Sequence, residues 1–140
     1  MNSKVLSVLK IVFAIFLLFF GANKLFHFFD PPSPPAGAMG YWEALMASKT
    51  MTLVAIVEIA AGLSLLLKKY ASLMMIILMS VTVNAVLYHL TLDPASVMMA
   101  IVLLALNVVM LYAYKDSYKR ITKLILFIKY MLKALYSAFI

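Results

Sequence analysis

Five side chains that could bind or react lie within or beside long apolar runs of this chain: Lys24, His27, Glu58, Asn84 and His89. An ammonium, a carboxylate, an amide and two imidazoles can bind the polar head of a ligand, exchange protons or ligate a cofactor. If the apolar runs cross a membrane, the charged groups among them are costly to place there. Such groups are normally paired, protonated or exposed to a wet cavity, and they mark candidate functional sites.

Glu58 and Lys24 are expected to lie at similar depth. Glu58 precedes Lys68 by about 15 Å on a helix rising about 1.5 Å per residue, and Lys24 follows Lys10 by about 21 Å. Side chains lean toward the N-terminus of their helix, so on antiparallel neighbours these two converge. The sequence predicts a contact between Lys24 and Glu58, and leaves open whether the pair only clamps two helices or also contacts a ligand.

The two histidines lie near the same end of their helices. His27 shares a helix face with Asn23 and Lys24, whereas His89 and Asn84 lie on different faces. Two histidines on different helices could ligate haem, or one could donate a hydrogen bond to a quinone carbonyl. The simpler interpretation is that they bond to loop backbone, and haem is the least favoured of the three.

Other polar residues predict packing rather than chemistry. Ser80, Asn84, Tyr88 and Thr91 form a stripe on one helix face and are expected to bond to other helices. Asn107 stands alone and is expected to hold two helices together. The methionines have no spacing that requires a metal, and the sequence lacks a hydrolase nucleophile motif, a phosphate loop and a carboxylate-histidine cluster. Independent catalysis and a metal site are therefore not expected.

Composition places these residues in a membrane. The chain has 140 residues, of which 66% are hydrophobic and 12% charged, and its mean hydropathy is +1.07. A water-soluble globule needs more polar surface than this, so the lipid bilayer is the expected solvent. The chain contains no cysteine, which excludes disulfides and a CxxC relay. The net charge of +7 comes from lysines beside apolar runs, so anionic lipids rather than nucleic acid are the expected counter-charge.

The expected fold class is an all-α membrane protein with four transmembrane helices. Proline-rich, lysine-rich and Asp-Pro joints separate the apolar runs, and Trp42 predicts a short interfacial helix over 41–46. The expected spans are 5–29, 50–67, 71–90 and 95–114. They form one domain over 1–120, with a separate tail over 121–140.

The basic residues predict the orientation of the bundle. One side carries most of them: Lys4, Lys10, Lys68, Lys69, Lys115, Lys119, Arg120 and Lys123. Lys49 stands nearly alone on the other side. Basic residues concentrate on the cytoplasmic side of membrane proteins. Both termini are therefore expected in the cytoplasm, and the proline-rich segment 30–35, expected to be a stiff polyproline-like loop, outside.

The tail after Arg120 is expected to lie in the membrane surface. At about 100° per residue its basic residues fall on one half of a helix, and the apolar ones on the other: Ile121, Leu124, Ile125, Ile128, Leu132, Leu135 and Phe139. An amphipathic helix of this kind binds in the headgroup layer and favours anionic lipids. A fifth span is the alternative.

Four short motifs resemble, in the same order, the DoxX-like family of bacterial membrane proteins. They are the run from Gly21 to Phe29, the prolines at 31–35, the run Val57-Glu58-Ile-Ala-Ala-Gly62-Leu, and the segment from Asn84 through His89 to Pro94. The likeness covers roughly residues 5–118 and leaves out the tail.

The resemblance implies a four-helix bundle in the bacterial cytoplasmic (inner) membrane. It also implies an association with quinone-linked oxidoreduction, because the family takes its name from a subunit of a membrane thiosulfate:quinone oxidoreductase. The leading expectation is thus a quinone- or lipid-binding accessory subunit with a membrane redox partner or a second copy of itself. A structural or assembly protein and a small proton-linked carrier are the alternatives. The absence of cysteine argues against the thiol chemistry of related four-helix proteins.

Overall fold

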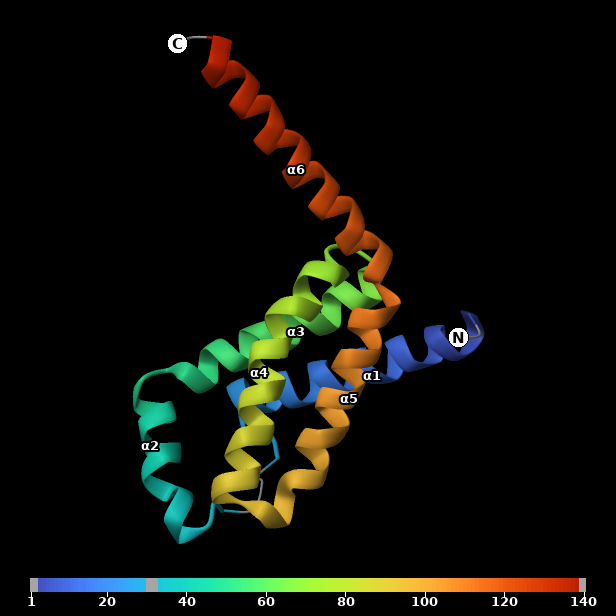
Figure 1. Cartoon of the computed structure of the whole chain (residues 1–140). Helices are drawn as coiled ribbons and strands as arrows, with labels where there is room; N and C mark the ends of the chain where they lie inside the picture. The colour runs from blue at the N-terminus through green and yellow to red at the C-terminus, as the bar shows by residue number, and fades with distance from the viewer. Residues whose placement is uncertain (1–2, 30–32, 139–140) are drawn as a thin grey trace.

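The computed structural model describes residues 3–29 and 33–138, without the side chains of Ile121, Leu124, Ile125 and residues 134–138. Its long elements are helices (Figure 1). Their bounds are α1 Ser3–Phe26, α2 Met39–Ala47, α3 Thr50–Leu67, α4 Ala71–Leu92, α5 Val97–Ala113 and α6 Lys115–Ala138. Short 3-10 turns, η1 over Ala36–Ala38 and η2 over Pro94–Ser96, precede α2 and α5.

The predicted all-α membrane fold is confirmed. No strand occurs among the described residues, and four helical segments are long and apolar enough to cross a bilayer. These segments are Ser3–Phe26, Thr50–Leu67, Ala71–Leu92 and Pro94–Ala113. Helix α6 is not among them, because its lysines interrupt the apolar residues.

Helices α1 and α3 are antiparallel and closely packed through glycines. A Cβ at Gly21 would lie 2.8 Å from Cγ1 of Ile59, and a Cβ at Gly62 would lie 2.8 Å from Cγ of Leu18. Each glycine also lies against a backbone carbonyl of the opposite helix, that of Ala55 or of Ala14. Small residues let two membrane helices approach this closely.

A buried polar contact joins α4 and α5. Nδ2 of Asn107 donates to the carbonyl oxygen of Met75 at 3.1 Å, and the Thr82 hydroxyl donates to Oδ1 of Asn107 at 3.1 Å. Asn107 is fully buried. The prediction that Asn107 holds two helices together is confirmed. Apolar side chains from several helices complete the core around it, among them Phe13, Leu17, Leu78 and Met110.

Helix α1 ends earlier than the predicted span, at Phe26 rather than Phe29. The backbone of His27 turns to a φ of 50°, which a helix does not continue. The Asn23 side chain then holds the outgoing chain at two points, since Nδ2 donates to the carbonyl oxygen of Phe29 and the Phe29 amide donates to Oδ1, both at 2.8 Å. The amide group of Asn23 thus replaces the helical bonds that end here.

The joints differ in their geometry. Residues 30–32 of the expected polyproline loop lie outside the described residues, and Pro35 has polyproline-like angles of −54° and 151°. The short turn between α3 and α4 is unusual because Lys68 and Tyr70 both have positive φ, 55° and 58°. Non-glycine residues adopt such angles at a conformational cost.

Helix α6 leads away from the bundle and continues the chain beyond the end of α5 (Figure 1). Its first turn is attached by the Tyr118 hydroxyl, which donates to the carbonyl oxygen of Ser72 at 3.0 Å. Burial, and then the nearby Tyr114, raise the pKa of the Tyr118 phenol, a group that is already a neutral donor at pH 7. Further along α6, the described apolar side chains, such as Phe127 and Leu132, are exposed. The surface placement of the tail stays a prediction, and the side chains of Ile121, Leu124, Ile125 and Leu135, and all of Phe139, lie outside the described residues.

Candidate functional site

Lys24 and Glu58 form an ion pair between α1 and α3. Nζ of Lys24 lies 2.7 Å from Oε2 and 3.0 Å from Oε1 of Glu58, and donates to both oxygens. The predicted contact is therefore confirmed. The side chain of Lys24 is 23% exposed and that of Glu58 only 7%, so the ammonium is the accessible member of the pair.

The glycine contact between the two helices brings the pair together. Glu58 lies in the third turn of α3. Its Cβ is 3.1 Å from the position that a Cβ at Gly21 would occupy. Lys24 is almost one turn further along α1, so its side chain reaches back toward the N-terminus of its helix to meet the carboxylate. A larger residue at position 21 would separate the helices at the point where the ion pair forms.

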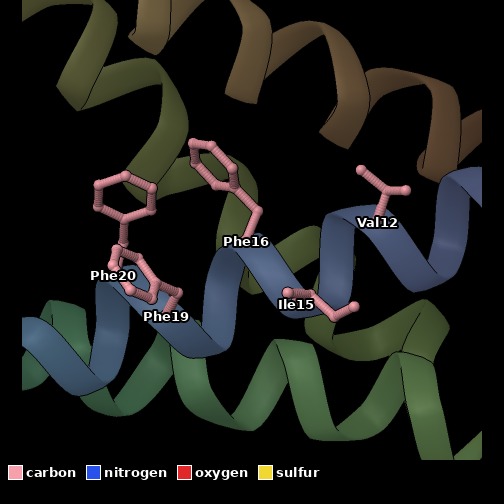
Figure 2. Close-up of a pocket in the computed structure, with 5 residues that line it drawn as sticks. All are labelled: Val12, Ile15, Phe16, Phe19 and Phe20. Atoms are coloured by element: carbon pink, nitrogen blue, oxygen red, sulfur yellow. The ribbon is translucent and has the colours of Figure 1, made fainter.

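A row of phenylalanines precedes Lys24 on α1. Phe16 and Phe20 lie eight and four residues before it, near the same helix face, and their ring centroids are 4.4 Å apart. With Val12, Ile15 and Phe19 they line a hollow of about 330 Å³ on α1. Figure 2 shows Val12, Phe16 and Phe20 pointing away from the green ribbon of α3. The hollow is an apolar surface of α1, and Lys24 is not among the residues that line it.

A second polar cluster lies near the end of α4. The Tyr41 hydroxyl donates to Oδ1 of Asn84 at 3.3 Å, and the Tyr41 ring stacks on Tyr88 with centroids 5.6 Å apart. Nδ1 of His89 lies 3.2 Å from Oδ2 of Asp93. These contacts attach α2 to α4 and hold the start of the turn into α5. His89 thus bonds to a carboxylate rather than to the loop backbone expected for it.

The structure brings together only part of the predicted site. Lys24 and Glu58 meet, and Asn84 and His89 belong to the cluster on α4. Among the described residues, no hydrogen bond, ion pair or ring contact joins these two groups. The His27 ring is exposed just beyond α1, three residues after Lys24. Their role in binding a ligand stays a prediction.

The expectation that the polar stripe of α4 bonds to other helices is wrong for Ser80 and Thr91. Their hydroxyls donate to carbonyls of their own helix, those of Ile77 and Leu87. Serine and threonine hydroxyls often satisfy themselves in this way. Asn84 accepts a hydrogen bond from Tyr41 of α2, and Tyr88 contacts α2 by stacking on the Tyr41 ring rather than by a hydrogen bond.

Three contributing residues were missed by the sequence reasoning. Asp93 lies four residues after His89, a spacing that places the two side chains on one helix face and could have revealed the contact. Tyr41 donates to Asn84, far along the chain. Asn23 donates to the carbonyl oxygen of Phe29, in an irregular turn. No periodic signal predicts those contacts.

The described residues contain no group of three or more His, Cys, Asp or Glu side chains placed to hold a metal ion. Each buried side-chain nitrogen or oxygen in the same part of the chain has a hydrogen-bond partner. The candidate features are therefore an ion pair between α1 and α3, an apolar hollow on α1 and an exposed imidazole just beyond α1.

These features define a multi-pass membrane bundle with a charged pair between two of its helices. The family comparison gives the more particular assignment, since the DoxX family model matches residues 5–91. The chain belongs to the DoxX family. The matched region includes both members of the ion pair and, from the cluster on α4, Tyr41, Asn84, Tyr88 and His89, whereas Asp93 lies just beyond it. No curated protein and no solved structure matched the chain.

Proposed function

We propose that this DoxX-family protein binds a quinone, or a similar flat lipid-soluble molecule, beside the Lys24–Glu58 pair. In this role it is an accessory subunit of a membrane oxidoreductase rather than an independent enzyme. The observation that carries the proposal is the ion pair within two apolar helices. Charged groups in such positions are costly and are usually retained where they serve a function.

The geometry favours a ligand with a hydrogen-bond acceptor. An ammonium has three protons, and two of the Lys24 protons point to the Glu58 oxygens. One donor remains, on the more exposed member of the pair. A quinone carbonyl oxygen is an acceptor of suitable chemistry, and Glu58 keeps the ammonium in position.

The phenylalanines suggest how the rest of such a ligand would lie. Phe16 and Phe20, eight and four residues before Lys24 on α1, offer aromatic surface, and aromatic rings pack well against other flat rings. The isoprenoid tail of a quinone would continue into lipid. His27, three residues after Lys24, has an exposed side chain that can form a further hydrogen bond. Oδ1 of Asn84 and Nδ1 of His89 already have partners.

A binding experiment tests this proposal. The purified protein is titrated with short-chain ubiquinone and menaquinone analogues in mild detergent, and lipid-soluble molecules that copurify with it are identified by mass spectrometry. We expect binding to the wild type and loss of binding in the double variant Lys24→Met/Glu58→Gln. The matched control is Thr82→Val/Asn107→Leu, which removes another buried polar contact and should keep the ligand. Equal binding by all three proteins, or none by the wild type, would contradict the proposal.

A structural or assembly role is the second candidate. It is favoured by the complete pairing of buried side-chain polar atoms in the described residues, which packing alone can explain. The double variant separates the two candidates, because a purely structural pair can be replaced by neutral side chains without loss of any ligand. The third hypothesis, a proton-linked carrier, depends on the position of Glu58 within a membrane span. It is less favoured because Lys24 donates to both carboxylate oxygens, which stabilises the charged form of Glu58.

We also propose the bacterial cytoplasmic membrane as the location, with both termini in the cytoplasm. The charge distribution supports this orientation, since most basic residues lie at the end of the bundle that contains Lys10 and Lys68. We call this end the lysine end. A membrane redox partner or a second copy of the chain would complete the proposed assembly.

A further inference from the structure

A groove opens between α1 and α3 at the lysine end, away from the Lys24–Glu58 pair. Its volume is about 450 Å³, and it is lined by Ser7, Lys10, Ile11, Leu65, Leu66 and Lys68. One helix supplies a hydroxyl and an ammonium, and the other supplies the second ammonium. Apolar side chains from both helices form the remaining wall.

Neither lysine of the groove has a carboxylate partner in the part of the chain that the structure describes. The ion pairs among the described residues are Lys24–Glu58, His89–Asp93 and Lys119–Asp116. Lys10 instead places its ammonium 4.5 Å from the centroid of the Tyr114 ring. Such a contact favours a cation without neutralising it. Two positive charges that share one groove repel each other, and an anion between them relieves that repulsion.

The turn that follows α3 holds Lys68 at the groove. Lys68 is the residue after the last turn of the helix and has a φ of 55°. Glycine is the usual residue in this conformation, because it lacks the Cβ that makes the angle costly. A lysine here carries a conformational cost, which the attraction of its charge for an anion in the groove can offset.

We infer that this groove binds one anionic phospholipid, with its phosphate between Lys10 and Lys68. The polar groups of the groove lie toward the lysine end, and the exposed side chains of Ile11 and Leu66 belong to its apolar wall. An amphiphile with a negative head and acyl chains has the same arrangement of charge and apolar surface. The Ser7 hydroxyl donates to the carbonyl oxygen of Ser3, so its oxygen is left to accept a bond from a headgroup hydroxyl such as that of phosphatidylglycerol.

The test is retention of lipid in native mass spectrometry. The full chain is reconstituted in vesicles of equal amounts of phosphatidylglycerol and phosphatidylcholine and is then released into detergent. We expect one phosphatidylglycerol to stay bound to the wild type. The variant Lys10→Gln/Lys68→Gln should reduce this retention about tenfold or more, from the loss of two cations near an anionic group.

A matched control separates the groove from general surface charge. Lys69→Gln/Lys123→Gln removes the same charge from exposed lysines that do not line the groove, and should retain the lipid. Equal loss in both double variants would overturn the inference. So would a dimer mass without lipid, which would place a second copy of the chain on this face.

Two further variants keep the test independent of folding. Ser7→Phe fills the groove with no change of charge at an exposed position, so it should expel the lipid while the thermal stability is kept. Lys68→Gly removes one ammonium and relieves the positive φ, so the protein should be at least as stable and yet lose lipid. Retention of phosphatidylglycerol by both variants would show that the groove is not the binding site.

Discussion

The ammonium of Lys24 lies within hydrogen-bond distance of both carboxylate oxygens of Glu58, at 2.7 and 3.0 Å. Both residues lie in helices that can cross a bilayer. An unpaired charge at either position would therefore carry a large cost in free energy. This relationship links the packing of α1 on α3 to the proposed function.

Removal of one member of the pair should harm the protein more than removal of both. Lys24→Met or Glu58→Gln should each destabilise the bundle by about 3–5 kcal/mol, because the remaining group loses its partner in a buried site. The double change should recover part of that loss. Thermal unfolding of the four proteins in mild detergent measures the coupling energy, and strictly additive effects would mean that the contact is not formed.

The glycines between α1 and α3 should not tolerate a side chain. Gly21→Ala and Gly62→Ala each place a Cβ 2.8 Å from a side-chain carbon of the opposite helix, so we expect each to destabilise the protein by about 1–3 kcal/mol. Gly40→Ala is the control, since nothing lies within 4 Å of its added Cβ. It should be neutral or slightly stabilising in α2. A similar thermal shift for all three would count against the close packing.

The hydrogen bonds of Asn107 should contribute more to the stability of the bundle than a hydroxyl on the surface of α4 does. Asn107→Leu removes two hydrogen bonds that join α4 and α5, for an expected loss of about 0.5–2 kcal/mol. Ser80→Ala removes only a bond to its own helix and should have little effect. Their melting temperatures in detergent can be compared directly, and equal shifts would refute the role assigned to Asn107.

The orientation can be read with single cysteines, because the chain has none of its own. We expect a Ser33→Cys variant to react with a membrane-impermeant maleimide on intact cells. A Lys69→Cys variant should react only after the membrane is made permeable. The unmodified chain controls for background labelling. The opposite pattern would reverse the bundle and refute the orientation taken from the basic residues.

Removal of residues 121–140 should leave the bundle folded. The attachment of α6 at Tyr118 lies before the deletion, and the described apolar side chains beyond it are exposed. The truncated protein should bind less strongly to vesicles rich in anionic lipid, by about 1 kcal/mol for each lost lysine near the surface. It should still retain the lipid of the groove between α1 and α3. Loss of the folded bundle would instead favour the tail as a packed fifth span.

The sequence by itself determined the class of the protein and the residues of the ion pair. Helix length and hydropathy alone decide which segments can cross a bilayer. The lean of side chains along antiparallel helices predicted the contact of Lys24 with Glu58. The cost of buried polar groups likewise pointed to Asn107 as a link between helices, and the structure supplied its partners, Thr82 and Met75.

The tertiary structure decided which polar groups share a site. Helix periodicity places side chains on a face but does not state which neighbour that face meets. Asn84 and His89 were therefore grouped with Lys24, whereas in the fold they contact Tyr41 and Asp93. The end of α1 at Phe26 depends on the bonds of Asn23 to an irregular turn. The groove at Lys10 and Lys68 exists only because the glycine contact aligns two helices far apart in the sequence.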